Sequence, residues 1–135
     1  MKSNVLVMVF DNTGYCHAER ISPTYDDLIK VLFNGSDRYF DEVDIHIGNQ
    51  KYHVYMDSDR FNDPSMNIVG YDASFSSFLI GKVMIAKVDR NGDLYSLSDT
   101  DLANIKNSMY ITKCCFHPIN GERHRLSKII LKYDF

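Results

Sequence analysis

The sequence predicts an α+β domain in which an antiparallel or mixed sheet, built from β-hairpins, carries two helices packed on it. Apolar runs of strand length recur along the chain, turn signals separate neighbouring runs, and two segments combine helix-start signals with helical spacing. The 135 residues, 44% of them hydrophobic, suffice for one core but not for two ordinary domains. We expect residues 1–107 to form the α+β core domain and residues 108–135 a C-terminal basic β-hairpin extension packed on the same domain.

The first predicted hairpin joins the apolar run 5–10 to residues 15–21 across the turn signal Asp11-Asn12-Thr13-Gly14. The continuous apolar run indicates a strand covered on both faces. Ser22 and Pro23 then predict a helix start, because serine suits the N-cap and proline the first helical position. The helix should end near Asn34-Gly35, and its buried face is expected to hold Tyr25, Leu28, Ile29 and Leu32.

A second hairpin is predicted from the alternating segments 43–47 and 51–56, which flank Gly48-Asn49-Gln50. Two registers are open. A turn at Asn49-Gln50 places His46 opposite His53, whereas a turn at Gly48-Asn49 places Asp44 opposite His53.

The segment 57–78 has no clear period and predicts an irregular loop with one short strand near Ile68. Residues 79–88 predict a single strand, 89–93 a turn and 94–97 a returning strand. Ser98 with an acid at position 101 resembles a capping box and predicts a second helix. That helix should turn three apolar residues inward, namely Leu102, Ile105 and Met109.

The last predicted hairpin turns at Asn120-Gly121, a strong two-residue turn signal. Its register places Lys113 opposite Lys128, Cys115 opposite Leu126, and His117 opposite His124. One face is then basic and the other apolar.

The order of these elements, and the segment 80–105 above all, resembles a family of unknown function. Its members are small proteins encoded by phages, prophages and bacterial mobile elements, with a Gly-led strand before a loop and a Ser-Leu-Ser/Thr-Asp/Glu helix start. The match covers roughly residues 3–107, and residues 108–135 extend beyond it. Ser36 stands where the family usually has a second glycine. Most of the match is carried by Gly81, Leu97, Ser98 and Asp99, with support from Ile21 to Leu32 and Asn67. The resemblance implies a genomic setting and carries no activity with it.

Charge is unevenly distributed along the chain. Residues 1–104 hold sixteen acidic and nine basic residues, whereas residues 105–135 hold two acidic and six basic ones. The apolar run 5–10 is too short for a signal-peptide core or a membrane span, and three cysteines form no disulfide framework. We therefore expect a cytoplasmic protein with reduced thiols. The resemblance implies that this cytoplasm is that of a bacterial host cell.

No familiar catalytic motif occurs: the sequence has no P-loop, dinucleotide fingerprint, His-Glu-x-x-His or nucleophile elbow. We therefore expect no enzyme and no cofactor. Cys115, His117 and His124 share one face of the last predicted hairpin but lack a fourth zinc ligand, so no metal site is expected.

Two surfaces are candidates for binding. Acidic residues beside aromatic ones suit docking onto a basic protein surface. The expected partner-binding residues are Asp37, Tyr39, Asp41, Glu42, Asp44, Asp57 and Asp59. Neighbouring aromatic residues, Phe40, Tyr52, Tyr55 and Phe61, belong either to this surface or to the core. The basic ribbon formed by Lys113, His117, His124, Lys128 and Lys132 suits phosphate instead.

The leading hypothesis is a phage or mobile-element accessory protein that binds and inhibits a host nucleic-acid-handling or defence machine, of the anti-CRISPR or anti-restriction type. The expected partner is a host protein or ribonucleoprotein, with no membrane involved. The alternatives are a small-ligand, nucleotide-binding protein that uses the loop 57–78, or nucleic-acid binding through the basic ribbon.

Overall fold

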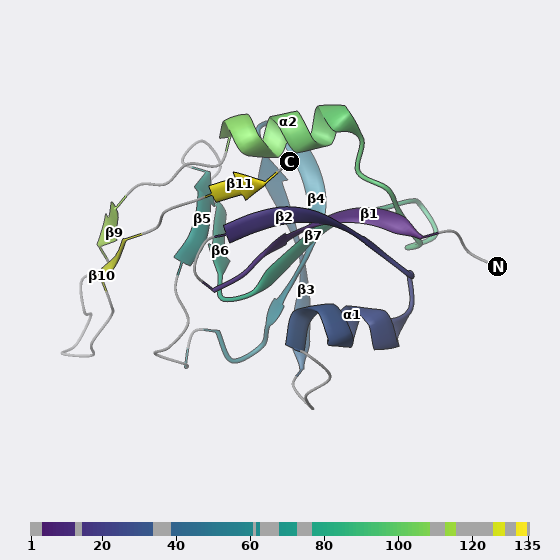
Figure 1. The fold of residues 1–135 in the computed structure, drawn as a ribbon, viewed down its shortest axis with the longest axis horizontal. Helices are drawn as coiled ribbons and strands as arrows, with labels where there is room; N and C mark the ends of the chain where they lie inside the picture. The colour runs from purple at the N-terminus through teal and green to yellow at the C-terminus, as the bar shows by residue number, and fades with distance from the viewer. Residues whose placement is uncertain are drawn as a thin grey trace.

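A seven-stranded mixed sheet forms the centre of the computed structural model (Figure 1). The structure describes residues 4–12, 15–33, 39–60, 62, 68–72, 77–108, 113–115, 126–128 and 132–134. The main strands are β1 (Val5–Phe10), β2 (Tyr15–Ile21), β3 (Phe40–Ile47), β4 (Gln50–Asp57) and β7 (Val83–Val88). Their order is β11-β2-β1-β7-β4-β3, where β11 is Lys132–Asp134, and β8 (Leu94–Tyr95) pairs with β7. β11 lies parallel to β2 and the other pairs are antiparallel, so the predicted α+β class is confirmed.

The two helices lie on opposite faces of this sheet, as Figure 1 shows. The two faces of β1 belong to different buried clusters, one with each helix. Val5, Val7 and Val9 join one buried cluster with Leu28 of α1 (Tyr25–Phe33). Met8 and Phe10 join a second cluster with Ile105 of α2 (Asp99–Ser108). Side chains alternate between the two faces along a strand. Because both faces of β1 are buried, apolar residues are needed at successive positions, which explains its continuous apolar run.

Helix α1 begins two residues later than Ser22-Pro23 indicated. The Asp27 amide donates to Thr24 Oγ1 at 3.3 Å, so Thr24 rather than Ser22 caps the helix. The Asp27 carboxylate in turn accepts the Ser22 amide at 2.9 Å. The predicted inward residues Leu28 and Leu32 are buried.

The β3–β4 turn settles the register that the sequence left open. Gly48 and Asn49 have φ of +56° and +75°, and two positive φ values define the type I′ turn that suits a two-residue hairpin. Asp44 therefore lies opposite His53, and His46 lies opposite Lys51.

Of the predictions for residues 57–97, the short strand near Ile68 is confirmed as β5 (Ile68–Asp72), which pairs with β6 (Ser77–Ile80). The prediction of one continuous strand over 79–88 is wrong. The single strand predicted over 79–88 is divided at Gly81, whose φ of +77° ends β6 before β7 starts. A glycine inside an apolar run is a signal that a strand ends or bends. The prediction gave more weight to the strand-like residues on both sides of Gly81 than to this signal.

The C-terminal strands follow the predicted register only in part. β9 (Lys113–Cys115) and β10 (Leu126–Lys128) pair with Lys113 opposite Lys128 and Cys115 opposite Leu126, as expected. β11 does not extend that hairpin. It adds to the main sheet, with Tyr133 opposite Cys16. Among the described residues, no helix is long and apolar enough to cross a bilayer.

Candidate protein-docking surface

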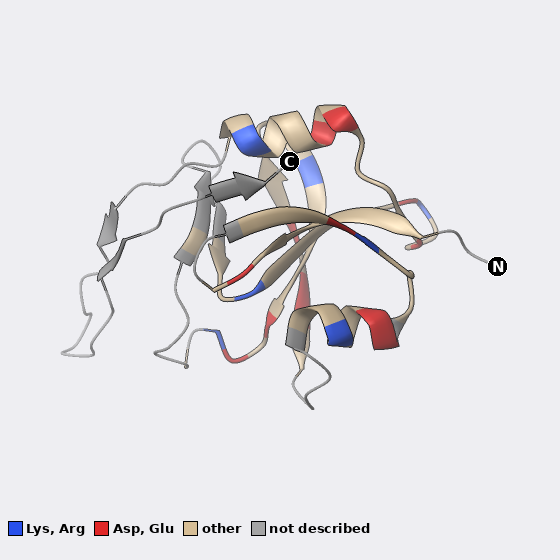
Figure 2. Cartoon of the chain, in the orientation of Figure 1, with Lys and Arg blue, Asp and Glu red and all other residues tan. Residues whose placement is uncertain are grey.

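The outer hairpin β3–β4 carries most of the acidic residues predicted to bind a partner. β3 is the last strand of the main sheet, and Figure 2 shows acidic residues along it. The side chains of Asp41, Glu42 and Asp44 are 49%, 56% and 48% exposed, and Tyr39 is 77% exposed just before the strand. Their apolar neighbours in β3 pack on the core, which fixes the strand in place. We call the surface formed by Tyr39, Asp41, Glu42, Asp44 and Asp59 the acidic edge.

His53 of β4 holds two of these carboxylates in place. Its Nδ1 lies 2.9 Å from Asp44 Oδ1, and its Nε2 lies 3.0 Å from Glu42 Oε1. A neutral imidazole has only one N–H, so donation to two carboxylates requires the imidazolium form. The sequence did not identify His53 as a site residue, because its role depends on the register that the sequence left open.

The pKa values of this trio follow from the same contacts. Burial lowers the pKa of His53, but the hydrogen bonds to Glu42 and Asp44 outweigh burial and raise it above 6.5. The hydrogen bond from His53 is the main reason that the pKa of Asp44 lies below 3.8. Lys51 Nζ, 3.5 Å from Asp44 Oδ2, also lowers the pKa of Asp44.

One aromatic ring packs against His53. The Tyr55 ring makes an edge contact with the imidazole at a centroid distance of 5.0 Å, and another with Phe40 at 5.4 Å. Tyr55 is 4% exposed, and burial raises its pKa to about 12. Tyr52 is 1% exposed. The sequence left open whether these aromatic residues belong to the docking surface or to the core. Both tyrosines belong to the core.

Asp57 differs from the other acidic residues because it is buried. Only 2% of the residue is exposed, and Oδ1 accepts the Asp59 amide at 2.8 Å, which stabilises the turn after β4. Arg60 donates to the Asp57 carbonyl at 3.1 Å and to Asp41 Oδ2 at 2.6 Å. Asp57 is thus a turn residue away from the exposed surface, while Asp59 is exposed. Asp37 and Phe61 lie outside the described residues.

The acidic edge keeps a negative charge despite these ion pairs. The acidic edge has four carboxylates and is paired with Lys51 and Arg60, so the charge of this group is −2 with neutral histidines and −1 when His53 alone is protonated. Asp41, Glu42 and Asp44 are positioned on the hairpin by Arg60, His53 and Lys51. A surface that is already ordered loses little conformational entropy when a basic partner binds.

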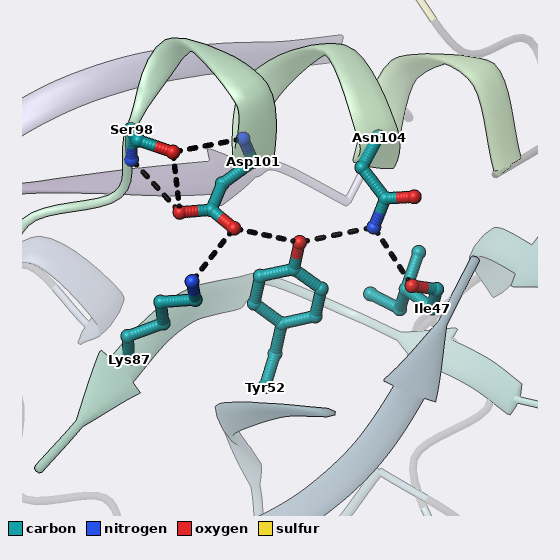
Figure 3. A network of polar contacts seen from close by, with 6 residues as sticks. All are labelled: Ile47, Tyr52, Lys87, Ser98, Asp101 and Asn104. Carbon is teal, nitrogen blue, oxygen red and sulfur yellow. Dashed lines mark hydrogen bonds and ion pairs between the residues drawn. The ribbon is translucent and has the colours of Figure 1, made fainter. Parts of the chain in front are cut away.

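A second polar cluster, which joins α2 to the sheet, is drawn in Figure 3. Asp101 Oδ2 accepts the Ser98 amide at 2.8 Å, and Oδ1 lies 2.9 Å from Lys87 Nζ and 3.1 Å from Tyr52 Oη. Asn104 Nδ2 donates to Tyr52 Oη at 3.0 Å and to the Ile47 carbonyl at 2.8 Å. The capping box was predicted, and its links to Tyr52 and Lys87 were not.

The electrostatics of this cluster indicate a structural role. Burial raises the pKa of Asp101, but hydrogen bonds from Ser98, Lys87 and Tyr52 outweigh burial and lower it below 3.8. Burial is also the main reason that the pKa of Tyr52 rises to about 12. Asp101 therefore stays ionised and Tyr52 stays protonated near neutral pH, and together they fix α2 above the core.

The predicted basic ribbon is divided between two sheets. Lys113 and Lys128 are cross-strand partners in β9–β10, whereas Lys132 lies in β11 of the main sheet. His117 and His124 lie outside the described residues. Within the part of the chain that the structure describes, no group of three or more His, Cys, Asp or Glu side chains suits a metal ion.

Comparisons of the chain with protein-family models, curated protein sequences and solved structures each give no match. The resemblance to phage-encoded proteins thus rests on its motif residues alone.

Proposed function

We propose that this chain is an accessory protein of a phage or mobile element that binds a bacterial nucleic-acid-handling or defence machine and inhibits it by protein–protein docking. The observation that carries the proposal is the acidic edge, where exposed carboxylates lie on β3 and an exposed tyrosine lies just before it. Machines that handle nucleic acid present basic surfaces to bind phosphate. An ordered acidic surface is complementary to such a site and competes with nucleic acid for it.

The test is a phage protection assay in a host with an active CRISPR or restriction system. Expression of the wild-type chain should raise the plating efficiency of a targeted phage at least a hundredfold in the system that it inhibits. The variant Glu42→Lys/Asp44→Lys should lose most of this effect, because reversed charges repel a basic surface. The matched control, Asp26→Lys/Asp99→Lys, reverses two exposed acidic residues in the helices and should keep it. Equal protection by both variants would refute docking through the acidic edge.

A second candidate, nucleic-acid binding by the β9–β10 ribbon, is supported by one specific observation. The register places Lys113 directly opposite Lys128, and like charges at cross-strand positions are destabilising unless an anion lies between them. The net charge of −3 on the whole chain opposes association with a polyanion, so we favour protein docking.

The nucleotide-binding alternative stays a prediction. It rests on the length of the segment 57–78, which contains β5 and the start of β6 and lies partly outside the described residues.

A further inference from the structure

The outer edge of β3 is a strand edge that no other described strand covers. β3 has eight residues, and within the described ranges its only strand partner is β4. An uncovered strand presents backbone N–H and C=O groups to which a further strand can add.

The hairpin register identifies the groups on this edge. The two-residue type I′ turn makes Ile47 and Gln50 the closing hydrogen-bonded pair. Bonding then alternates along the hairpin, so Val43 and Ile45 direct their N–H and C=O groups toward β4. Glu42 and Asp44 direct theirs toward the outer edge, where no described strand pairs with them. These are also the two residues whose side chains flank His53.

A second copy of the chain meets like charges at this edge when two β3 strands pair antiparallel about Val43, because Glu42 of one copy then lies opposite Asp44 of the other, twice. Directly opposite like charges destabilise a sheet, and charged residues on an edge strand are a common means of preventing self-association. A strand with basic side chains at the positions opposite Glu42 and Asp44 gains from the same geometry.

We propose that β3 takes up an extended segment of the partner as an additional strand, with Lys or Arg at alternate positions opposite Glu42 and Asp44. This inference deepens the proposed function and rests on it, because it specifies how the acidic edge meets its partner. Main-chain hydrogen bonds to Glu42 and Asp44 supply the docking geometry. The two carboxylates select for basic side chains.

Amide hydrogen exchange followed by NMR tests the edge in the free protein. The amides of Val43 and Ile45 should exchange slowly and those of Glu42 and Asp44 quickly, with at least a tenfold difference. Slow exchange at Glu42 and Asp44 in the free monomer would show a covered edge and overturn the proposal. Slow exchange that appears together with a dimer in sedimentation would assign the edge to a second copy and overturn it as well.

A synthetic peptide tests whether a basic extended segment adds to β3. The probe has eight residues, four Lys alternating with four Val, and its control has the same sequence with every peptide nitrogen methylated. The unmodified peptide should bind at least tenfold tighter and slow exchange at Glu42 and Asp44. Equal affinity of the two peptides, or no binding by either, would contradict strand addition.

A matched pair of variants separates the backbone from the charge. Glu42→Gln removes the charge and keeps the outward N–H, whereas Glu42→Pro removes both, and proline is tolerated on edge strands. Strand addition predicts that Glu42→Pro binds the peptide at least fivefold more weakly than Glu42→Gln. If the two variants bind alike while Glu42→Lys/Asp44→Lys still abolishes phage protection, strand addition fails and charge-based docking stands. If that reversal leaves protection intact, the proposed function itself fails.

Discussion

His53 Nε2 lies 3.0 Å from Glu42 Oε1, and the same ring lies 2.9 Å from Asp44 through Nδ1, so one imidazolium joins two carboxylates on the outer hairpin. This contact links the fold of the hairpin to the charge of the surface that it presents.

Stability should depend on pH through His53. The folded-state pKa of His53 is raised, so its contribution is fully present below the unfolded value of 6.5 and is lost as pH rises through the folded value. The free energy of unfolding in urea should therefore fall with rising pH above about 6.5. His53→Gln should show less of this fall, and an equal fall in both proteins would assign it to other groups.

At acidic pH the dependence should reverse through Asp44. Its folded-state pKa is lowered, so its contribution is present above the unfolded value of 3.8 and is lost as pH falls through the folded value. Urea unfolding of Asp44→Asn should depend less on pH in this acidic range than unfolding of the wild type.

The hydroxyl of Tyr52 should matter for stability and not for docking. Tyr52→Phe removes a buried group that pairs with Asp101 and Asn104, and an unsatisfied buried polar group costs about 1–3 kcal/mol. Tyr95→Phe is the matched control, because Tyr95 is 45% exposed and its change should cost less than about 0.5 kcal/mol. Urea unfolding measures both, and equal costs would contradict the structural role of the cluster.

Two glycines with positive φ should differ in their tolerance of alanine. A Cβ on Gly48 would collide with side-chain atoms of Ser108 and Asn104, in addition to the strain of its φ of +56°. Gly92, at φ +81°, has no described atom within 4 Å of the added Cβ. Gly92→Ala should cost about 1–2 kcal/mol from strain alone. Gly48→Ala should cost more and therefore have the lower thermal midpoint of unfolding. A lower midpoint for Gly92→Ala would show that α2 lies farther from the β3–β4 turn.

The sequence identified the elements whose signals are local. The first hairpin, both helices, the Ser98 capping box and the pairing of Lys113 with Lys128 follow from turn residues and apolar spacing within short segments. The pairing of β11 with β2 joins residues more than a hundred positions apart, and no local signal specifies it.

The candidate site was predicted only in outline, for the same reason. The exposure of Asp44 follows from alternation, whereas the burial of Asp57 depends on the turn contacts of Asp59 and Arg60. The role of His53 required a choice between two registers, and the positive φ values of Gly48 and Asn49 made that choice.

The basic ribbon offers a direct test of the competing hypothesis. If docking is right, electrophoretic shifts at ~100 mM salt, where the screening length is ~10 Å, should show no sub-micromolar binding to DNA or RNA. Such binding, lost in Lys113→Glu/Lys128→Glu, would favour the ribbon instead.

The most direct measurement of the central claim is the association rate of the chain with the host complex that the phage protection assay identifies, recorded over a range of salt concentrations. The account predicts that Glu42→Lys/Asp44→Lys slows association at least tenfold at low salt, that the difference shrinks as salt rises, and that Asp26→Lys/Asp99→Lys associates like the wild type. Association of the Glu42→Lys/Asp44→Lys variant at the wild-type rate at every salt concentration would contradict docking through the acidic edge.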